Sequence, residues 1–410
     1  MKAAALTLLA LLGSIVVVVL LTVPFPVLPG AHPHVNVARD FTTMQLARER
    51  AYHDAVRLPS YASLLVSLLI AGIVGLTGLG SRLVGGLPGG WVVKILVGTP
   101  VLLGLGRLVT LPLDARTEVV LRRFGLSTQD WNGWLSDQLR SFGITAVTTV
   151  VVVLVLLGLA RRLPGTWWAW GGLATAVLVC VGSFIYPVVV EPAFNSFTSL
   201  PAGQLRTDLL ELARRDGVPV KDVLVADASR RTTALNAYVS GFGSTRRVVL
   251  YDTLIRSATP QEVELVVAHE LGHAKRQDVL HGTIIGALGG AAGICVLYLL
   301  LSWQPLLRRV GATSAGDPRV LGLVLFLGVA APLVVSPLTN LVSRHIEARA
   351  DVHSLDLTRD VPTFITSEQR LATVNLSNLD PQPLTYALFY THPSSPQRIA
   401  LAREWERLHR

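Results

Sequence analysis

The pentapeptide His269-Glu270-Leu271-Gly272-His273 places two histidines four residues apart, with a glutamate beside the first. On a helix, such histidines are separated by about 6 Å of rise and about 40° of rotation, so both can point at one metal ion. Glu270 can reach a water next to that metal and act as a general base. The preceding run from Pro260 to Ala268 starts like a helix, with acids in its first turn. The pattern predicts a catalytic zinc site on a helix; the alternative is a helix with two surface histidines.

The composition indicates a membrane protein. Of the 410 residues, 51% are hydrophobic and 15% are charged, and the mean hydropathy is +0.51. Soluble domains carry about 25% charged residues. The net charge is +9, but the arginines are spread over several connecting segments, as expected at a lipid bilayer rather than at a nucleic-acid site. The two cysteines, Cys180 and Cys295, lie in apolar runs and provide neither a disulfide framework nor a cysteine zinc site.

Seven apolar segments are predicted to span a bilayer, which needs about 20 residues. They are Ala3–Val23, Tyr61–Leu83, Val92–Leu113, Ile144–Leu159, Trp167–Val189, Gly282–Leu301 and Val320–Leu341. The fourth is short, and the third carries Arg107, an ionisable residue of the kind that is usually functional or interhelical within a membrane. The first segment can also be interpreted as a signal peptide, but its length and the prolines at 24 and 26 favour a retained helix.

The basic residues of the connecting segments predict an orientation. With the N-terminus outside, eight arginines fall on the inner side, at positions 39, 48, 50, 57, 116, 122, 123 and 140. The positive-inside rule then places the catalytic segment in the cytoplasm, although Lys2 argues the other way and a cleaved signal peptide would reverse the arrangement. Richness in Ala, Val, Leu, Gly and Arg hints at a high-GC bacterial source, so we expect a bacterial plasma membrane.

The spans divide the chain into four parts. We expect an N-terminal membrane domain of about five spans at 1–190, the first half of a protease domain at 191–281, two further spans at 282–341 and the second half of the protease domain at 342–410. In the first polar block, the sequence predicts an amphipathic helix at Leu200–Asp216, strands at Val223–Ala226, Asn236–Ser240 and Arg247–Tyr251, and a turn at Gly241-Phe242-Gly243.

A third metal ligand is predicted after the last span, because a catalytic zinc normally has three protein ligands and an open position. The stretch from Ser343 to Asp351 places Glu347 and Asp351 on one face of a helix, one turn apart. Glu347 can bind the metal while Asp351 accepts a hydrogen bond from a ligand histidine and fixes its orientation. His345 and His353 are rival ligands, but each lies on a different face from Glu347. The alternative is a juxtamembrane helix whose acids pair with neighbouring arginines.

A further polar stretch, from Thr391 to Ile399, contains His392 and Arg398. A histidine and an arginine there could donate hydrogen bonds to the oxyanion that forms when water attacks a peptide carbonyl. A proline-rich turn with one histidine is more often structural, so spacing alone does not assign them a catalytic role.

Together these stretches resemble the type 1 CAAX prenyl proteases, integral-membrane zinc metallopeptidases related to the bacterial heat-shock membrane proteases. The matching stretches are 122–127 with 134–137, 194–201, 227–231, 236–241, 249–254, 269–273, 343–351 and 391–399. The run from 227 to 233 lacks the second serine often seen before Asn236, a departure that touches no ligand.

The resemblance implies a predominantly α-helical polytopic membrane protein. About seven transmembrane helices would surround a chamber, and a small α+β gluzincin-like zinc protease domain would cap its cytoplasmic end. It further implies one zinc ion per chain and the roles that follow. His269, His273 and Glu347 bind zinc, Glu270 is the base, His392 and Arg398 stabilise the transition state, and Asn236 and Ala237 lie on an edge strand that binds the substrate main chain.

We therefore expect a membrane-embedded zinc metalloendopeptidase whose substrates are membrane-associated, lipidated or misfolded peptides or proteins. A non-proteolytic zinc-containing membrane scaffold or translocation factor is the alternative, although a structural zinc usually has four protein ligands. A protease that cuts within the bilayer would carry the pentapeptide inside an apolar span. Here it is flanked by Glu262, Glu264, Lys275, Arg276 and Asp278. The sequence predicts no oligomeric state.

Overall fold

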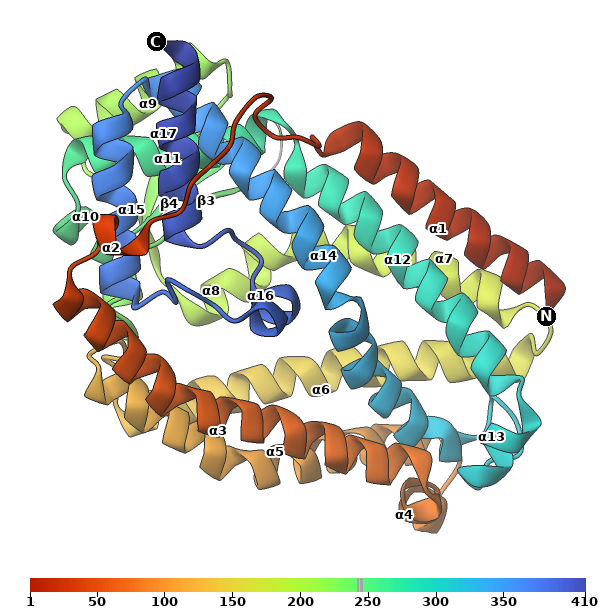
Figure 1. The fold of residues 1–410 in the computed structure, drawn as a ribbon. Coiled ribbons are helices and arrows are strands. Elements are labelled where there is room, and N and C mark those ends of the chain that lie inside the picture. The colour runs from red at the N-terminus through yellow and green to blue at the C-terminus, as the bar shows by residue number, and fades with distance from the viewer. Residues whose placement is uncertain (242, 244–245) are drawn as a thin grey trace.

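The computed structural model describes residues 1–241, 243 and 246–410. Within these residues, seven helices are long and apolar enough to cross a membrane, which confirms the predicted number of spans. They are α1 (Lys2–Thr22), α3 (Thr43–Leu76), α5 (Trp91–Arg123), α6 (Trp131–Arg162), α7 (Trp167–Ile185), α12 (Asp278–Leu301) and α14 (Leu321–Thr358). Figure 1 shows the sheet and most of the smaller helices at one end of these membrane helices, with the short helices α4 (Gly78–Gly86) and α13 (Gln304–Arg309) at the other end.

The second predicted span is wrong at its C-terminal end. The prediction runs to Leu83, whereas α3 ends at Leu76 and the chain turns into the short helix α4 (Gly78–Gly86). A Cβ atom at Gly80 would collide with the carbonyl oxygen of Val74, so the tight approach of these two helices depends on glycine. Mean hydropathy does not detect this break because both helices are apolar.

Two predicted spans are parts of much longer helices. The short fourth segment lies within α6, which has 32 residues. The seventh, apart from its first residue Val320, lies within α14, which has 38 residues and continues past the apolar stretch to Thr358. Because of this continuity, α14 carries Glu347 and Asp351 directly from the membrane domain into the protease part (Figure 1).

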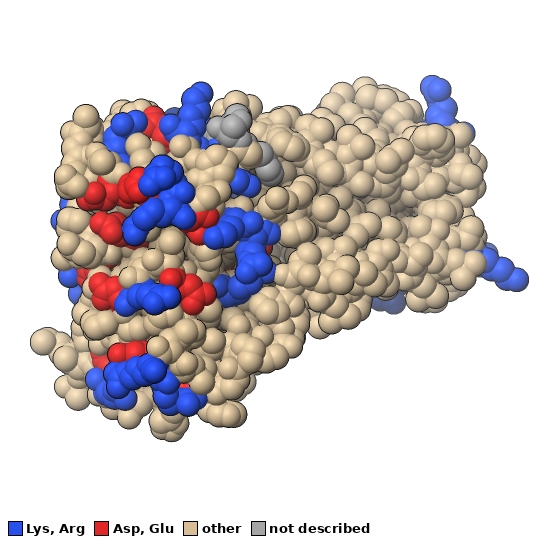
Figure 2. Space-filling model, turned by 90° about the horizontal axis from the view of Figure 1, so that it is seen from above, with Lys and Arg blue, Asp and Glu red and all other residues tan. Residues whose placement is uncertain are grey.

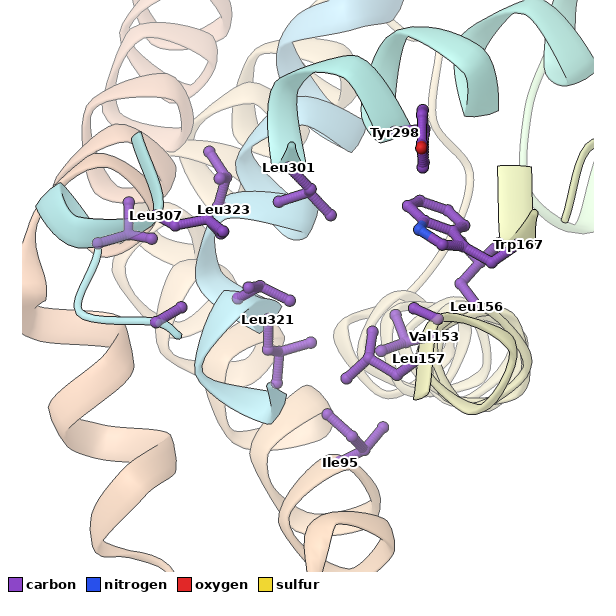
Figure 3. Close-up of a cluster of buried hydrophobic side chains, with 14 of the residues drawn as sticks. Ile95, Val153, Leu156, Leu157, Trp167, Tyr298, Leu301, Leu307, Leu321 and Leu323 are labelled. Atoms are coloured by element: carbon purple, nitrogen blue, oxygen red, sulfur yellow. The ribbon is translucent and has the colours of Figure 1, made fainter. Parts of the chain in front are cut away.

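The membrane helices are joined by a buried apolar cluster at the end away from the sheet (Figure 3). Trp167 at the start of α7 is 2% exposed, and its ring lies edge-on to Tyr298 of α12, with 5.6 Å between the ring centroids. Leu157 of α6 and Leu321 of α14 are members of the same cluster. Such aromatic pairs add to the free energy gained from burying apolar area, so the cluster joins six of the membrane helices, α1, α5, α6, α7, α12 and α14.

Charged and uncharged side chains lie on different parts of the outer surface along the long axis. Figure 2 shows charged side chains concentrated over one end of the viewed face, with a largely uncharged surface over the rest. The uncharged surface includes exposed large apolar side chains such as Leu9 and Leu21 of α1, which are 65% and 80% exposed. Large exposed apolar surfaces are costly in water and are expected where lipid covers a protein.

The protease part contains a four-stranded sheet with the order β1-β2-β4-β3. The strands are β1 (Phe197–Ser199), β2 (Asp222–Ala226), β3 (Ala237–Ser240) and β4 (Arg247–Tyr251). β2 and β4 are parallel, whereas β1 and β3 pair antiparallel to their neighbours. The three predicted strands are present. Phe242 of the predicted turn after β3 lies outside the described residues.

Helices enclose the sheet and build the rest of the protease part. The predicted amphipathic helix is α9 (Gln204–Asp216), which starts four residues later than expected. The remaining helices in this part are α2 (Val37–Asp40), α10 (Asp252–Ser257), α11 (Pro260–Lys275), α15 (Val361–Asn375), α16 (Pro383–Phe389) and α17 (Ser395–His409), whereas α8 (Glu191–Phe194) continues the fifth membrane span that starts with α7. Leu209 of α9, Leu250 of β4 and Leu271 of α11 are buried in one core between the helices and the sheet.

Candidate zinc protease site

Helix α11 presents the pentapeptide because its ends and its buried face are well defined. Thr259 and Glu262 form a capping box at its N-terminus, and Pro260 occupies the first turn. Val263, Val267 and Leu271 are at most 1% exposed and pack into the sheet core. His269, Glu270 and His273 lie in the C-terminal half of the same helix.

The ligand side chains of α11 and α14 converge as the sequence predicted. The Nε2 atoms of His269 and His273 are 3.1 Å apart. The Glu347 carboxylate lies 3.3 Å from His269 Nε2 and 3.6 Å from His273 Nε2. One ligand atom from each residue lies within 4.8 Å of the other two. The structure thus brings two imidazoles and one carboxylate to a single point.

This donor set fits a zinc ion on two structural grounds. Two histidines and a glutamate are a ligand combination of catalytic zinc sites. Glu347 Oε2 is buried and has no hydrogen-bond partner among the described residues. A buried carboxylate oxygen is costly without a partner, and a metal ion at the convergence point would supply one.

A glycine allows the two ligand-bearing helices to approach. A Cβ atom at Gly272 would lie 3.0 Å from the His353 side chain of α14. His353 is turned away from the metal cluster, with its Nε2 3.0 Å from Asp216 of α9. His345, the other rival ligand, has its Nδ1 2.9 Å from the carbonyl oxygen of Leu341. Neither belongs to the convergent group.

Each ligand histidine has a carboxylate on its second ring nitrogen. His269 Nδ1 lies 2.8 Å from Asp351 and donates to it, so Asp351 occupies the position predicted for it. His273 Nδ1 donates to Asp278 at 2.9 Å. Donation from Nδ1 leaves the Nε2 lone pair of each ring free for the metal. The sequence interpretation missed Asp278, although its position five residues after the last histidine was a usable signal.

The carboxylates also govern how the histidines bind protons. Burial lowers the pKa of His269, but the carboxylates of Asp351 and Glu347 beside its ring outweigh burial and raise that pKa to about 9. Burial likewise opposes charge on His273, and the carboxylates of Asp278 and Glu347 beside it raise its pKa to about 10. Protons and a metal cation therefore compete for this negatively charged cluster.

The contacts of Arg398 favour a different role from the one that the resemblance implied. Its Nε donates to Asp351 at 2.8 Å and its Nη1 pairs with Glu368 at 2.7 Å. Its Nη2 pairs with the other Asp351 oxygen. The guanidinium thus holds Asp351, which in turn contacts His269. Arg398 also lines the smaller cavity together with Glu270 and His392, so its implied role at the transition state stays a prediction.

Glu270 and His392 both line the same two cavities. Burial raises the pKa of the Glu270 carboxyl, which brings it toward the range useful to a general base near neutral pH. His392 Nε2 lies 3.3 Å from Glu347. Desolvation lowers the pKa of His392, which favours the neutral ring, and a neutral imidazole keeps one N–H to donate.

The predicted substrate-binding residues lie at the edge of the sheet next to the cleft. β3 is an edge strand, and the exposed Asn236 immediately precedes it. Two cavities, of about 340 Å³ and about 730 Å³, both include Asn236, Ala237, Glu270 and His392 in their walls. They meet at the metal cluster, so a cleft passes along β3 and continues on both sides of the cluster.

The protein also matches known families and structures. The family described as peptidase family M48 matches residues 199–406, and the family described as CAAX prenyl protease N-terminal, five membrane helices, matches residues 41–196. The chain is 34% identical to the uncharacterised metalloprotease YhfN of Bacillus subtilis, over 73% of this chain and 71% of the relative. It is 30% identical to a CAAX prenyl protease 1 homologue of Arabidopsis thaliana, over 69% and 67% of the two chains.

A solved structure shares the whole fold. The crystal structure of Ste24p from S. mikatae aligns with a TM-score of 0.80 at 22% identity, over 97% of this chain and 98% of that one. The fold comparison and the family match to five membrane helices agree with a polytopic membrane protein. The chain belongs to peptidase family M48, and it is a membrane-embedded metalloprotease.

Proposed function

We propose that the protein is a zinc endopeptidase in which His269, His273 and Glu347 hold one zinc ion and Glu270 is the general base. One observation carries this proposal. The two imidazole Nε2 atoms and the Glu347 carboxylate converge while Glu270 lies beside them at the wall of an open cleft. Three protein ligands leave a position for substrate or water, whereas a structural site is usually closed by a fourth ligand.

When bound, zinc lowers the pKa of water and polarises the scissile carbonyl. Glu270 removes a proton from the attacking water and passes it to the leaving amine nitrogen. Neutral His392 donates its N–H to the carbonyl oxygen as negative charge develops there. Asp351 and Asp278 hold the two ligand rings in the tautomer that exposes Nε2. Arg398 holds Asp351 and is a positioning residue in this proposal.

Substrate binding is proposed to use the free edge of β3. A peptide in extended conformation adds a strand to such an edge, and its main chain forms hydrogen bonds with the strand. Asn236 and Ala237 then position the scissile bond next to Glu270, because all three residues line the same cleft. The cleft continues on both sides of the cluster, which fits cleavage within a chain better than removal of a terminal residue.

The substrates are proposed to be polypeptides presented at the membrane, including lipidated or misfolded ones. One wall of the larger cavity is formed by Val279 and Leu280 of α12 and by Ile346 of α14, where those helices leave the membrane domain. Relatives named CAAX prenyl protease 1 homologues also support a membrane-associated substrate.

We also propose the domain division and orientation inferred from the sequence. The parts 191–281 and 342–410 form one protease unit in this proposal, since α11 and α14 supply the ligands jointly. The protease part would face the cytoplasm of a bacterial plasma membrane. Support comes from the arginines of the α1–α3 and α5–α6 connections, which lie at the protease end (Figure 1).

The test is cleavage of an unstructured peptide by the full-length protein in liposomes, with products mapped by mass spectrometry. Wild type should cleave at defined bonds, and Glu270→Gln should lose at least a thousandfold in kcat, because the base is removed while the ligands remain. A chelator should abolish the wild-type activity, and zinc should restore it. Equal cleavage by wild type and Glu270→Gln would contradict the proposal and favour a non-proteolytic scaffold.

A further inference from the structure

The main-chain groups of β3 point alternately toward β4 and toward the free edge of the sheet. The N–H of Tyr251 in β4 donates to the carbonyl oxygen of Asn236 at 3.0 Å. The β3–β4 register places Ala237 opposite Leu250, one step after the pair that this bond joins. Hydrogen-bonded and non-hydrogen-bonded pairs alternate along an antiparallel ladder. Ala237 and Val239 therefore direct their N–H and C=O groups away from β4, toward the free edge.

Leu235, two residues before Ala237, faces the same edge, but a side chain already pairs with its main chain. Asn375, the last residue of α15, provides that side chain. Its Oδ1 accepts from the N–H of Leu235 at 2.8 Å, and its Nδ2 donates to the carbonyl oxygen of Leu235 at 3.1 Å. A neighbouring strand would form the same two bonds with one residue. Asn375 thus takes the place of a strand at Leu235 and ends the free edge there.

The end of α15 holds Asn375 in place. The next residue, Leu376, has a φ of +49°, a left-handed conformation that leucine adopts only at a cost. Leu376 is 2% exposed, and its carbonyl oxygen accepts a hydrogen bond from His53 Nε2 of α3 at 2.9 Å. Burial and a contact from another helix therefore keep the end of α15 in one conformation, and the Asn375 amide keeps a fixed direction toward Leu235.

The two cavities of the cleft lie along different parts of this edge. Leu235 and Asn375 line the smaller cavity, and Val239 lines the larger one. Ala237 lines both. The free part of the edge thus starts at Ala237 and continues along the larger cavity. An extended peptide can form main-chain hydrogen bonds there with Ala237 and Val239, which are about 7 Å apart along the strand. Toward the smaller cavity, the peptide meets the Asn375 amide instead of a free strand edge.

The main-chain bonds at Ala237 and at Leu235 differ in how readily a peptide replaces them. Oδ1 of Asn236 accepts a hydrogen bond from the N–H of Ala237 at 3.0 Å. A substrate carbonyl replaces that single bond with one of the same kind, so the exchange changes little in hydrogen-bond energy. Pairing at Leu235 would break both bonds to Asn375 at once and displace an amide that the end of α15 holds in place.

We propose that Asn375 is a positioning residue that ends the substrate-binding edge and confines main-chain pairing to Ala237 and Val239. This inference rests on the proposed function and adds a pattern of substrate recognition to it. The strand binds the substrate main chain along the larger cavity. Along the smaller cavity, the substrate contacts the wall without pairing with the strand.

The test uses the full-length protein and an unstructured peptide whose cleaved bond has been mapped, with its residues N-methylated one at a time. N-Methylation removes one N–H donor. With wild type, kcat/KM should fall about fivefold at two positions, two residues apart, because each loses one hydrogen bond to the carbonyl oxygen of Ala237 or Val239. Sensitivity at a third position, two residues from this pair, would overturn the inference without any variant.

Two replacements of Asn375 separate the end of the edge from a general structural role. Asn375→Ala opens the edge at Leu235 and should add the third sensitive position. Asn375→Leu loses the same two bonds but still fills the space, so it should not add one. A merely structural role would weaken cleavage by both variants and leave the pattern unchanged. Asn378→Ala is the matched control, because Asn378 lines the same cavity but accepts from the N–H of Asp380 in its own loop, at 3.1 Å.

A binding measurement without turnover separates this inference from the catalytic proposal. The affinity of the same N-methylated peptides for the Glu270→Gln protein, measured by fluorescence anisotropy, should fall about fivefold at the same two positions. Cleavage by wild type with no such pair of positions, or an unchanged pattern in a folded, zinc-containing Asn375→Ala protein, would overturn the inference and leave the protease intact. The pair of positions in binding, without cleavage by wild type, would support the inference and refute the catalytic proposal.

Discussion

Replacing Arg349 should weaken zinc binding although this residue touches no ligand. Arg349 of α14 is buried to 14% side-chain exposure and pairs with Asp278, whose other oxygen accepts the proton of His273 Nδ1 at 2.9 Å. Its Nη1 donates to the carbonyl oxygen of Thr22, the last residue of α1. Arg349 therefore connects the end of the N-terminal helix to the orientation of one zinc ligand.

The size of the effect follows from which contacts each variant leaves in place. Losing an outer partner of a metal-binding histidine costs about 10- to 100-fold in metal affinity. Arg349→Gln leaves Asp278 on His273 but removes the cation that holds it, so we expect about tenfold weaker zinc binding, about 1.4 kcal/mol. Asp278→Asn removes the charged acceptor itself and should approach the hundredfold end of the range.

Zinc dissociation constants should be measured by competition with a chromophoric chelator in detergent. Arg403→Gln is the matched control, because it breaks a similarly buried pair with Asp40 that shares no residue with the metal cluster. It should lower thermal stability without changing zinc affinity. The reasoning is refuted if Arg349→Gln and Asp278→Asn bind zinc as tightly as wild type.

Three further predictions concern residues around the cleft. His392→Ala should lower kcat by about 10²–10³-fold with zinc content unchanged, as for loss of an oxyanion donor; a change in KM alone would contradict this role. Arg398→Met leaves two buried carboxylates without their cation and should lower stability by about 3–5 kcal/mol in thermal unfolding, and an unchanged Tm would count against it. Gly272→Ala should lose about 1–3 kcal/mol and some zinc affinity, because the added Cβ presses on His353. Gly282→Ala, with nothing within 4 Å of its Cβ, should show neither loss.

The membrane spans were predictable because a single segment that crosses the lipid bilayer must form a helix. Backbone groups in the bilayer core must be satisfied within the segment, so a long apolar run becomes a helix. Hydropathy detects only the part of each helix that faces lipid or the core, and it therefore missed the polar beginning of α3 and the polar end of α14. It also carried the second span past Leu76, where close packing at Gly80 and not polarity ends the helix.

The ligand cluster was predictable because its spacing is local. His269 and His273 share one helix, and so do Glu347 and Asp351, so helical geometry alone gives each half of the site. The partners that come from other elements were not predictable in this way. Asp278 accepts from His273 across the α11–α12 turn, and its contact with Arg349 depends on how α12 packs beside α14.

For Arg398, the role that the family resemblance implies can be compared with the contacts that the side chain makes. The resemblance implied a transition-state role, whereas all of its short contacts are to the carboxylates of Asp351 and Glu368 and to the His269 ring. Glu368 comes from α15, which no spacing in the sequence relates to the pentapeptide. The contacts of Arg398 with Glu368 and Asp351 therefore depend on the packing of α15 and α17 against α11 and α14, which spacing does not predict.

The most direct test of the central claim is zinc stoichiometry in three purified variants measured beside wild type. Wild type and Glu270→Gln should each contain about one zinc per chain, since Glu270 is proposed as the base and not as a ligand. Glu347→Ala should lose most of its zinc, whereas His353→Ala, which removes a rival ligand, should retain it. Zinc retained in Glu347→Ala and lost in His353→Ala would contradict the proposed ligand set.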